Sequence, residues 1–338
     1  MEKSLKNFIS GEIHIGIQDF VNMKNIMLCG DSNYIKYIGV TINSIVILNP
    51  TERYAFHIFC DKLNDMDLEK LYKTNELYGC SINIYLFNTK AVSGLTMVVN
   101  SQSHVNVATL FRLIGFGVLP NEIQKVLYLD SDILVNGNIN EFWTNNMNGS
   151  IALVVEDVGN ITHSKRINVQ KYFNAGVMFV DLVKWNQLNL TEETINLLFD
   201  GSIWRFMDQD VLNVVLDGKV IFISPKYNYM YRLNHTINAV HLGGEVPVIY
   251  HFIGISKPWC EWTQEIDVVN KYNNILKKTF WNDNTLTKAS EINSQWVKYK
   301  VYKTIYRGAK ENKQLLKYFT NFLLYSYYKT KYIFSRGY

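Results

Sequence analysis

The chain has 338 residues, of which 48% are hydrophobic and 19% are charged, with a formal net charge of +4. This composition excludes a disordered, collagen-like or low-complexity chain, and the length suits one large α/β domain with additions. No stretch reaches the roughly 20 uncharged apolar residues that span a bilayer, and the N-terminus lacks the basic-then-apolar order of a signal peptide. We therefore expect a cytoplasmic protein in a reducing compartment.

Short β-rich segments alternate with helical segments through the first 250 residues. The alternation is typical of a mostly parallel sheet, whose ligands bind at the carboxyl ends of the strands. The predicted strands cover residues 25–28, 54–60, 81–86, 125–129, 151–155, 177–181, 220–223 and 248–252. The predicted helices cover residues 65–77, 107–116, 191–199 and 208–216.

The four cysteines are scattered along the chain without any CxxC spacing. Each lies in or beside an apolar stretch, which favours buried thiols over a zinc site or a disulfide framework. They are Cys29, Cys60, Cys80 and Cys260.

The C-terminal region differs in composition from the body. Residues 296–338 contain ten Lys or Arg and one acid, so they carry +9 while the other 295 residues carry −5. Thirteen of these 43 residues are aromatic. We expect an N-terminal extension over residues 1–23, a catalytic domain over 24–262 and a helical region over 263–338 that ends in this basic, aromatic tail.

The most informative motif is Asp130-Ser131-Asp132, which follows a buried strand. Carboxylates at positions i and i+2 of an extended chain point the same way, and together they can chelate a hard divalent cation. A solvated acidic turn is the alternative interpretation of this triplet alone.

A second motif closes the last predicted strand, from His251 to Trp259. The His251 imidazole can complete a metal site, Lys257 suits a phosphate, and Gly254 between them allows close approach of the backbone. A histidine that only fills the core is the alternative for His251.

These motifs, taken in order, resemble those of glycosyltransferase family 8, the retaining nucleotide-sugar transferases, over about residues 24–262. Within the family the similarity is greatest to bacterial lipopolysaccharide core glucosyl- and galactosyltransferases. One difference is Ser32, which stands where many members of the family have a second acid. The matching segments are 29–34 (CGDSNY), 110–113 (LFRL), 127–132 (LYLDSD), 172–177 (YFNAGV, similar to an acceptor-side loop), 208–213 (DQDVLN) and 251–259.

The resemblance implies a GT-A-like α/β fold, with a single Rossmann-type domain, a mostly parallel mixed sheet and a helical C-terminal region. It implies Mn²⁺ or Mg²⁺ on Asp130, Asp132 and His251. It implies catalytic roles for Asn174, Asp208, Gln209 and Lys257, although Asp208 can instead cap a helix. It implies nucleotide-sugar contacts from Cys29, Asp31, Asn33, Arg112, Asp130, Ser131, Asp132, Asn174, Asp208, Gln209, His251, Gly254 and Lys257.

Gln209 is a neutral amide and a poor nucleophile, so retention is better explained by transfer on one face of the sugar than by a double displacement. Arg112 either reaches the diphosphate, pairs with a carboxylate of the site or forms a salt bridge that caps its helix.

The expected activity is transfer of glucose or galactose from a UDP-sugar to the lipopolysaccharide core. A self-glucosylating starter protein of the glycogenin kind and a glycan-binding module without turnover are the alternatives. We expect the tail to bind the anionic inner membrane on its cytoplasmic face, with no nucleic-acid partner. The alternatives for the tail are a packed helical pair and a platform for single-stranded nucleic acid.

Overall fold

The computed structural model describes residues 5–88, 90–91, 107–233, 242, 244–283 and 285–335. The chain forms two compact units. The first comprises Met1–Tyr229, Ala239–His251 and Lys278–Trp281. The second comprises Met230–Asn238, Phe252–Lys277 and Asn282–Tyr338.

The first unit is built on an eight-stranded sheet with the order β1-β4-β3-β2-β5-β8-β7-β9. Strands β4, β3, β2 and β5 run parallel to one another, whereas β1 and β8 pair antiparallel with their neighbours. This confirms the predicted mostly parallel mixed sheet. The strands are β1 (Ile9–Ile15), β2 (Lys24–Cys29), β3 (Tyr54–Cys60), β4 (Ser81–Phe87), β5 (Lys125–Leu129), β7 (Ala152–Glu156), β8 (Phe173–Asp181) and β9 (Val220–Phe222).

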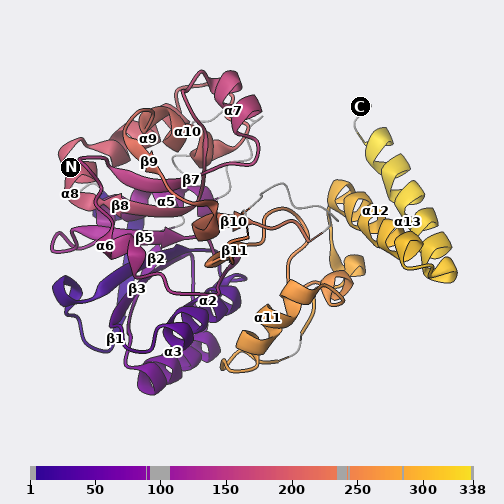
Figure 1. Cartoon of the computed structure of the whole chain (residues 1–338), viewed down its shortest axis with the longest axis horizontal. Helices are drawn as coiled ribbons and strands as arrows, with labels where there is room; N and C mark the ends of the chain where they lie inside the picture. The colour runs from indigo at the N-terminus through magenta and orange to yellow at the C-terminus, as the bar shows by residue number, and fades with distance from the viewer. Residues whose placement is uncertain are drawn as a thin grey trace. The chain divides into compact units, whose positions relative to one another are not determined.

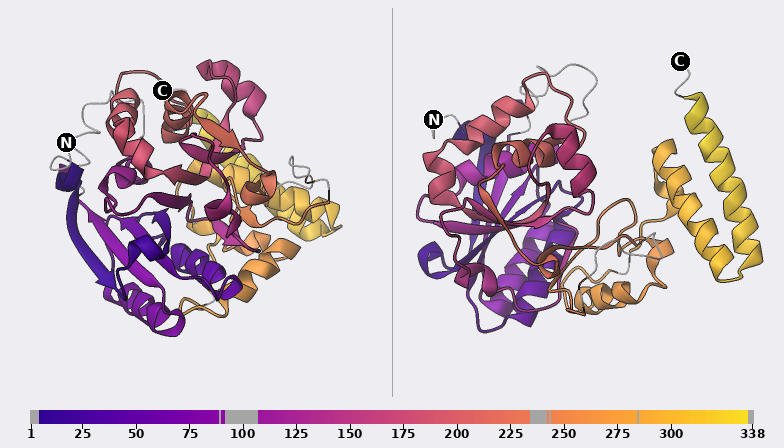
Figure 2. Two further views of the ribbon diagram at one scale, coloured as in Figure 1. Left: turned by 60° about the vertical axis from the view of Figure 1, so that its left-hand side comes forward. Right: turned by 45° about the horizontal axis from the view of Figure 1, so that its top comes forward.

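Helices cover both faces of this sheet because its inner strands are apolar on both sides. Met27 and Phe59 pack in one core with Phe111, and α2 and α3 lie on the opposite side of the strands from α8, α9 and α10 (Figures 1 and 2). The helices of the unit are η1 (Lys6–Phe8), η2 (Phe20–Asn22), α2 (Ile35–Leu48), α3 (Asp65–Tyr78), α5 (Val107–Val118), α6 (Glu141–Thr144), α7 (Asn160–Ile167), α8 (Leu182–Gln187), α9 (Leu190–Leu198), α10 (Met207–Val215) and η3 (Pro225–Asn228).

A smaller sheet has the strand order β10-β11-β6. Its strands are β6 (Ile133–Val135), β10 (Tyr229–Met230) and β11 (Ile249–His251). β6 pairs antiparallel with β11, so that His251 lies opposite Ile133. Because Ile133 directly follows the DxD segment, this register places a strand-end histidine beside two strand-end carboxylates.

The second unit is helical, as expected for the C-terminal region. Its small core contains Val301 and Tyr302 of α12, packed with Ala289, Ile255 and Trp262. The helices α12 and α13 form a hairpin (Figure 1). The elements of this unit are η4 (Glu261–Thr263), α11 (Asp267–Leu276), η5 (Ala289–Glu291), α12 (Gln295–Glu311) and α13 (Leu315–Phe334).

Two features of the first unit differ from the expectations. Residues 9–15, expected in an extension, form β1 and cover the edge of β4. Residues 173–176, expected in a loop, begin β8 and pair with β7 through an irregular register. Residues 9–15 largely alternate apolar and polar side chains, as a strand with one exposed face does, whereas the consecutive Asn174, Ala175 and Gly176 interrupt the apolar pattern of β8.

All four cysteines are buried free thiols, as expected. Among the described helices, none combines the length and the hydropathy that crossing a membrane requires.

Candidate active site

Three side chains that we predicted as metal ligands lie together in the first unit. His251 Nε2 is 3.2 Å from Asp132 Oδ1 and 3.6 Å from Asp130 Oδ2. One ligand atom from each residue lies within 4.8 Å of the other two. The His251 side chain is 5% exposed, whereas Asp130 is 29% exposed, so the group opens on the carboxylate side. Two carboxylates and an imidazole are a donor set consistent with a divalent-metal site.

Gly176 of β8 permits this close approach. A Cβ at this position would collide with the His251 ring and would lie 2.8 Å from Asp130 Oδ2. The backbone of β8 therefore forms the floor of the site, and any larger residue would push the ligands apart.

A chain of hydrogen bonds fixes the tautomer of His251. The Gly176 N–H, which can only donate, binds Asn174 Oδ1 at 3.0 Å, and this oxygen also accepts from Asn228 Nδ2 at 2.9 Å. Asn228 Oδ1 is therefore left to accept the proton on His251 Nδ1, at 2.9 Å. The lone pair of Nε2 then faces the two carboxylates, which is the orientation that a metal ligand needs.

Arg112 contacts both the predicted metal ligand Asp130 and a neighbouring acid, Asp208. Its guanidinium donates to the Ala175 carbonyl at 2.5 Å, lies 3.5 Å from Asp130 Oδ1 and forms an ion pair with Asp208. Its carbon Cζ lies 4.8 Å from the centre of the Tyr128 ring. Of the roles considered for Arg112, the structure shows the pair with site carboxylates.

Asp208 does not cap its helix, contrary to the structural alternative considered above. Helix α10 begins at Met207, and its N-cap, Phe206, makes no side-chain cap. Asp208 faces Arg112 instead. Burial raises the pKa of this carboxyl, and the facing Arg112 guanidinium opposes the rise.

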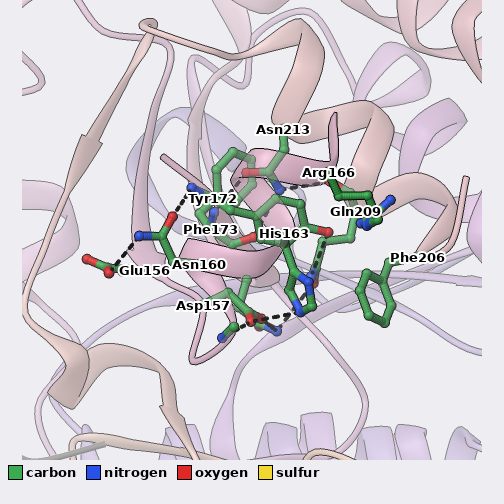
Figure 3. A network of polar contacts seen from close by, with 12 residues as sticks. Glu156, Asp157, Asn160, His163, Arg166, Tyr172, Phe173, Phe206, Gln209 and Asn213 are labelled. Carbon is green, nitrogen blue, oxygen red and sulfur yellow. Dashed lines mark hydrogen bonds and ion pairs between the residues drawn. The ribbon is translucent and has the colours of Figure 1, made fainter. Parts of the chain in front are cut away.

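Gln209 lies one residue further on and is bonded at both ends of its amide. Oε1 accepts from the Ala175 N–H at 3.1 Å and from Asn174 Nδ2 at 3.3 Å. Nε2 donates to the Tyr172 hydroxyl at 3.2 Å. Figure 3 shows Gln209 within this network of polar contacts. Asn174 therefore contacts both Gln209 and the Asn228 that orients His251.

The predicted nucleotide loop follows β2. Asp31 accepts the Asn33 N–H at 2.9 Å, and the Ser32 N–H donates to Asp61 at 2.7 Å, so the loop is held as a tight turn. Burial raises the pKa of Cys29 well above its ordinary value, which marks a structural thiol. Ser131 is half-buried between the two aspartates.

Gly254 and Lys257 belong to the second unit. Gly254 has φ +89°, a conformation that L-residues rarely adopt. Lys257 Nζ donates to the Phe252 carbonyl at 2.7 Å, which turns this segment back on itself. Their proposed phosphate contacts remain predictions.

Several residues of the cluster were missed by the sequence analysis. Asp157 directly follows β7 and binds Asn174 Nδ2 at 3.2 Å. It carries the same signal as Asp130, a carboxylate at the end of a buried strand, and could have been found by it. Tyr172 and Asp210 lie within the matching segments 172–177 and 208–213 but were given no role, and Asn228 has no such signal, because only the folded chain brings it to the site.

The chain was compared with known proteins. Residues 25–263 match the model of glycosyl transferase family 8. A lipopolysaccharide 1,2-glucosyltransferase of Escherichia coli K12 is 31% identical over 277 residues, which are 78% of this chain and 80% of the relative. A lipopolysaccharide 1,3-galactosyltransferase of Salmonella typhimurium is 30% identical over 245 residues, 69% of this chain and 72% of the relative.

Among solved structures, the galactosyltransferase LgtC, in complex with donor and acceptor sugar analogs, has a similar fold. The TM-score is 0.64 at 20% identity, with 77% of this chain and 99% of that chain covered. The family match over more than two thirds of the residues, together with the relatives at 30% identity or more, confirms the resemblance: the chain belongs to glycosyl transferase family 8.

Proposed function

We propose that the chain is a metal-dependent, retaining hexosyltransferase that moves glucose or galactose from a UDP-sugar to the lipopolysaccharide core. One observation carries the proposal: Asp130, Asp132 and His251 converge beside the Asn174 and Gln209 amides. The two relatives, named as transferases of glucose and galactose to lipopolysaccharide, support the substrate class.

The nucleotide end of the donor would lie over the loop after β2. In the proposal Asp31 accepts the uracil imide proton, while Asn33 and the backbone at Cys29 and Ser131 hold the base and the ribose. Gly254 and Lys257 would contact the diphosphate, where a fixed ammonium offsets the charge of the departing UDP.

The metal ligands would be Asp130, Asp132 and His251, with Mn²⁺ or Mg²⁺ as the ion. When bound, the ion neutralises charge on the diphosphate as the sugar leaves. The protein's own contribution is orientation, since Asn228 directs the His251 lone pair and Gly176 keeps the three side chains close.

The transferred sugar would lie beside Arg112, Asn174, Asp208 and Gln209. Asp208 is buried and ion-paired, so it is a weak nucleophile, and Gln209 is neutral. Both facts favour transfer on one face of the sugar, in which the Gln209 amide stabilises positive charge on the ring.

The proposal is tested by supplying UDP-glucose or UDP-galactose with and without a lipopolysaccharide core acceptor. We expect transfer that requires the acceptor, with the anomeric configuration of the donor retained. A product attached to the protein's own tyrosines would indicate a glycogenin-like protein, and donor binding without turnover would indicate a binding module. An inverted product would contradict the retaining mechanism.

The C-terminal helices support peripheral binding to an anionic membrane as a second part of the proposal. Leu324 and Tyr328 of α13 pack toward α12, whereas Leu316, Phe319 and Leu323 are 83%, 59% and 67% exposed. An uncovered apolar helix face beside lysines is typical of a helix that lies in the head-group region of a bilayer.

A further inference from the structure

The Gln209 amide is held on its nitrogen side by a buried cluster that the proposed function does not use. The cluster consists of Tyr172, Asp210 and Arg166 (Figure 3 shows Tyr172 and Arg166). Tyr172 and Asp210 are both fully buried. The Tyr172 hydroxyl donates to Asp210 Oδ1 at 2.5 Å, and the two guanidinium nitrogens of Arg166 donate to the same carboxylate at 2.7 and 2.8 Å.

The direction of each hydrogen bond in this cluster follows from its chemistry. An ionised carboxylate only accepts, so the Tyr172 proton points at Asp210. The Tyr172 oxygen can then only accept from Gln209, which assigns the NH₂ group of the amide to the tyrosine side, at 3.2 Å. On the other side the Ala175 N–H can only donate, which assigns the carbonyl oxygen of Gln209 to the β8 side. Both assignments agree.

Asp210 is held in its ionised form by its surroundings. Burial by itself would raise the pKa of this carboxyl, but the hydrogen bonds from Arg166, Tyr172 and the Phe206 N–H outweigh burial and lower it. The Phe206 N–H, 3.0 Å from Oδ2, also ties the start of α10 to the same carboxylate. Met207, which follows Phe206, has φ +46°, a strained value for a residue other than glycine. It directly precedes Asp208 and Gln209.

We propose that Tyr172 is a positioning residue: anchored by Asp210 and Arg166, it holds the nitrogen end of the Gln209 amide and so fixes the direction in which the amide faces the sugar. Without it the amide is held only at its carbonyl oxygen, by the Ala175 N–H and Asn174 Nδ2, and its NH₂ group loses its acceptor. The inference rests on the proposed function, in which Gln209 acts on the transferred sugar.

The test is a double-mutant cycle with Tyr172→Phe and Gln209→Ala. We expect Tyr172→Phe to lower kcat on the order of 10-fold to 100-fold, with KM for the UDP-sugar changed less than about twofold. In the Gln209→Ala background the same change should have almost no further effect, because the residue through which Tyr172 acts is gone. Equal losses in both backgrounds, or an unchanged kcat in Tyr172→Phe, would overturn the inference.

A matched control is Tyr85→Phe, which removes another buried hydroxyl, 3.2 Å from His57 Nδ1. It should lower the melting temperature without the kcat effect, and a matching kcat loss in this variant would mean that Tyr172 acts only through stability. If Tyr172→Phe does not fold, Arg166→Gln takes its place in the cycle, since the Arg166 side chain is 25% exposed.

A readout without turnover separates this inference from the proposed function. The side-chain NH₂ signals of ¹⁵N-glutamine-labelled protein report the hydrogen bond of Gln209 directly, and the Gln209→Ala spectrum assigns them. We expect slow solvent exchange in the wild type and fast exchange in Tyr172→Phe. Unchanged exchange would overturn the positioning role, whereas absence of transfer in the wild type would contradict only the proposed function.

Discussion

Asn228 determines which ring nitrogen of His251 carries the proton. Substitution of Asn228 therefore disturbs the orientation of this predicted metal ligand while the ligand itself stays in place. Asn228→Leu removes the acceptor for the His251 Nδ1 proton, 2.9 Å away. Loss of such a partner typically weakens metal affinity 10-fold to 100-fold, and we expect a change of about that size for Mn²⁺. Asn228→Asp keeps an acceptor and should lose less. Titration calorimetry on the folded variants measures this, and a leucine variant that binds Mn²⁺ like the wild type would contradict the orientation chain.

At the scale of single residues, the sequence identifies those site residues that directly follow or end buried strands. Asp130 and Asp132 stand directly after an apolar run, and His251 ends another, and the antiparallel pairing of β11 with β6 brings them together. Asn228 is the last residue of the short 3₁₀ helix η3 and has no local pattern of its own. Its role depends on the Gly176 N–H and on Asn174, which only the folded chain places beside it.

Helices α7 and α10 are joined by the ion pair between Arg166 and Asp210, and this pair makes stability depend on pH. Because the folded state lowers the pKa of Asp210 below its ordinary value of 3.8, its contribution is complete above that value and is lost as the pH falls through the lower, folded-state value. In Asp210→Asn this acid-dependent part is absent.

Urea unfolding at a series of pH values tests this statement. Near pH 7 we expect Asp210→Asn to be less stable than the wild type, since the variant leaves Arg166 without its carboxylate. The difference should shrink as the pH falls below about 3.8. A difference that stays constant down to the acid transition would mean that the pair does not link α7 to α10 energetically.

Strands that are clear apolar runs were predictable from the sequence, whereas strands that carry residues of the site were not fully predicted. The pattern predicted β3 and β5 to the residue, because each is an apolar run closed by a polar residue. β8 was predicted to begin at Val177, but it begins at Phe173, where the polar and small residues of the site interrupt the apolar run. The same residues that carry the function therefore hide the strand.

At the scale of the whole chain, the basic C-terminal region divides into two helices with different surroundings. α12 buries Val301 and Tyr302 in the small core of the second unit, as a packed helical pair requires. No residue of α13 is buried, and its outer face carries Leu316, Phe319 and Leu323. Composition alone does not separate these helices, since both alternate lysines with aromatic residues.

We expect α13 to bind anionic vesicles through this outer face. Phe319→Glu combined with Leu323→Glu should reduce co-sedimentation with vesicles that contain acidic lipid, because both apolar anchors are lost and two negative charges are added. A matched control adds the same charge at exposed polar positions, with Thr320→Glu and Asn312→Glu, and should reduce binding less. Equal losses in the two double variants would attribute binding to net charge alone, and no loss in either would contradict membrane docking.

The central claim is that Asp130, Asp132 and His251 hold a divalent ion on which hexose transfer depends. The most direct measurement is the rate of transfer from the UDP-hexose in chelator and in Mn²⁺ or Mg²⁺, for the wild type and for Asp132→Ala. Asp200→Ala is the matched control, since it removes an exposed carboxylate that accepts a hydrogen bond from the Ser202 N–H and was given no role in the site.

The account predicts that chelator silences the wild type and that added Mn²⁺ or Mg²⁺ restores it. In Asp132→Ala the rate should stay on the order of 10³-fold lower at any metal concentration, because several kcal/mol of charge stabilisation are lost, while Asp200→Ala behaves like the wild type. Full transfer by the wild type in chelator, or by a folded Asp132→Ala variant in metal, would contradict it.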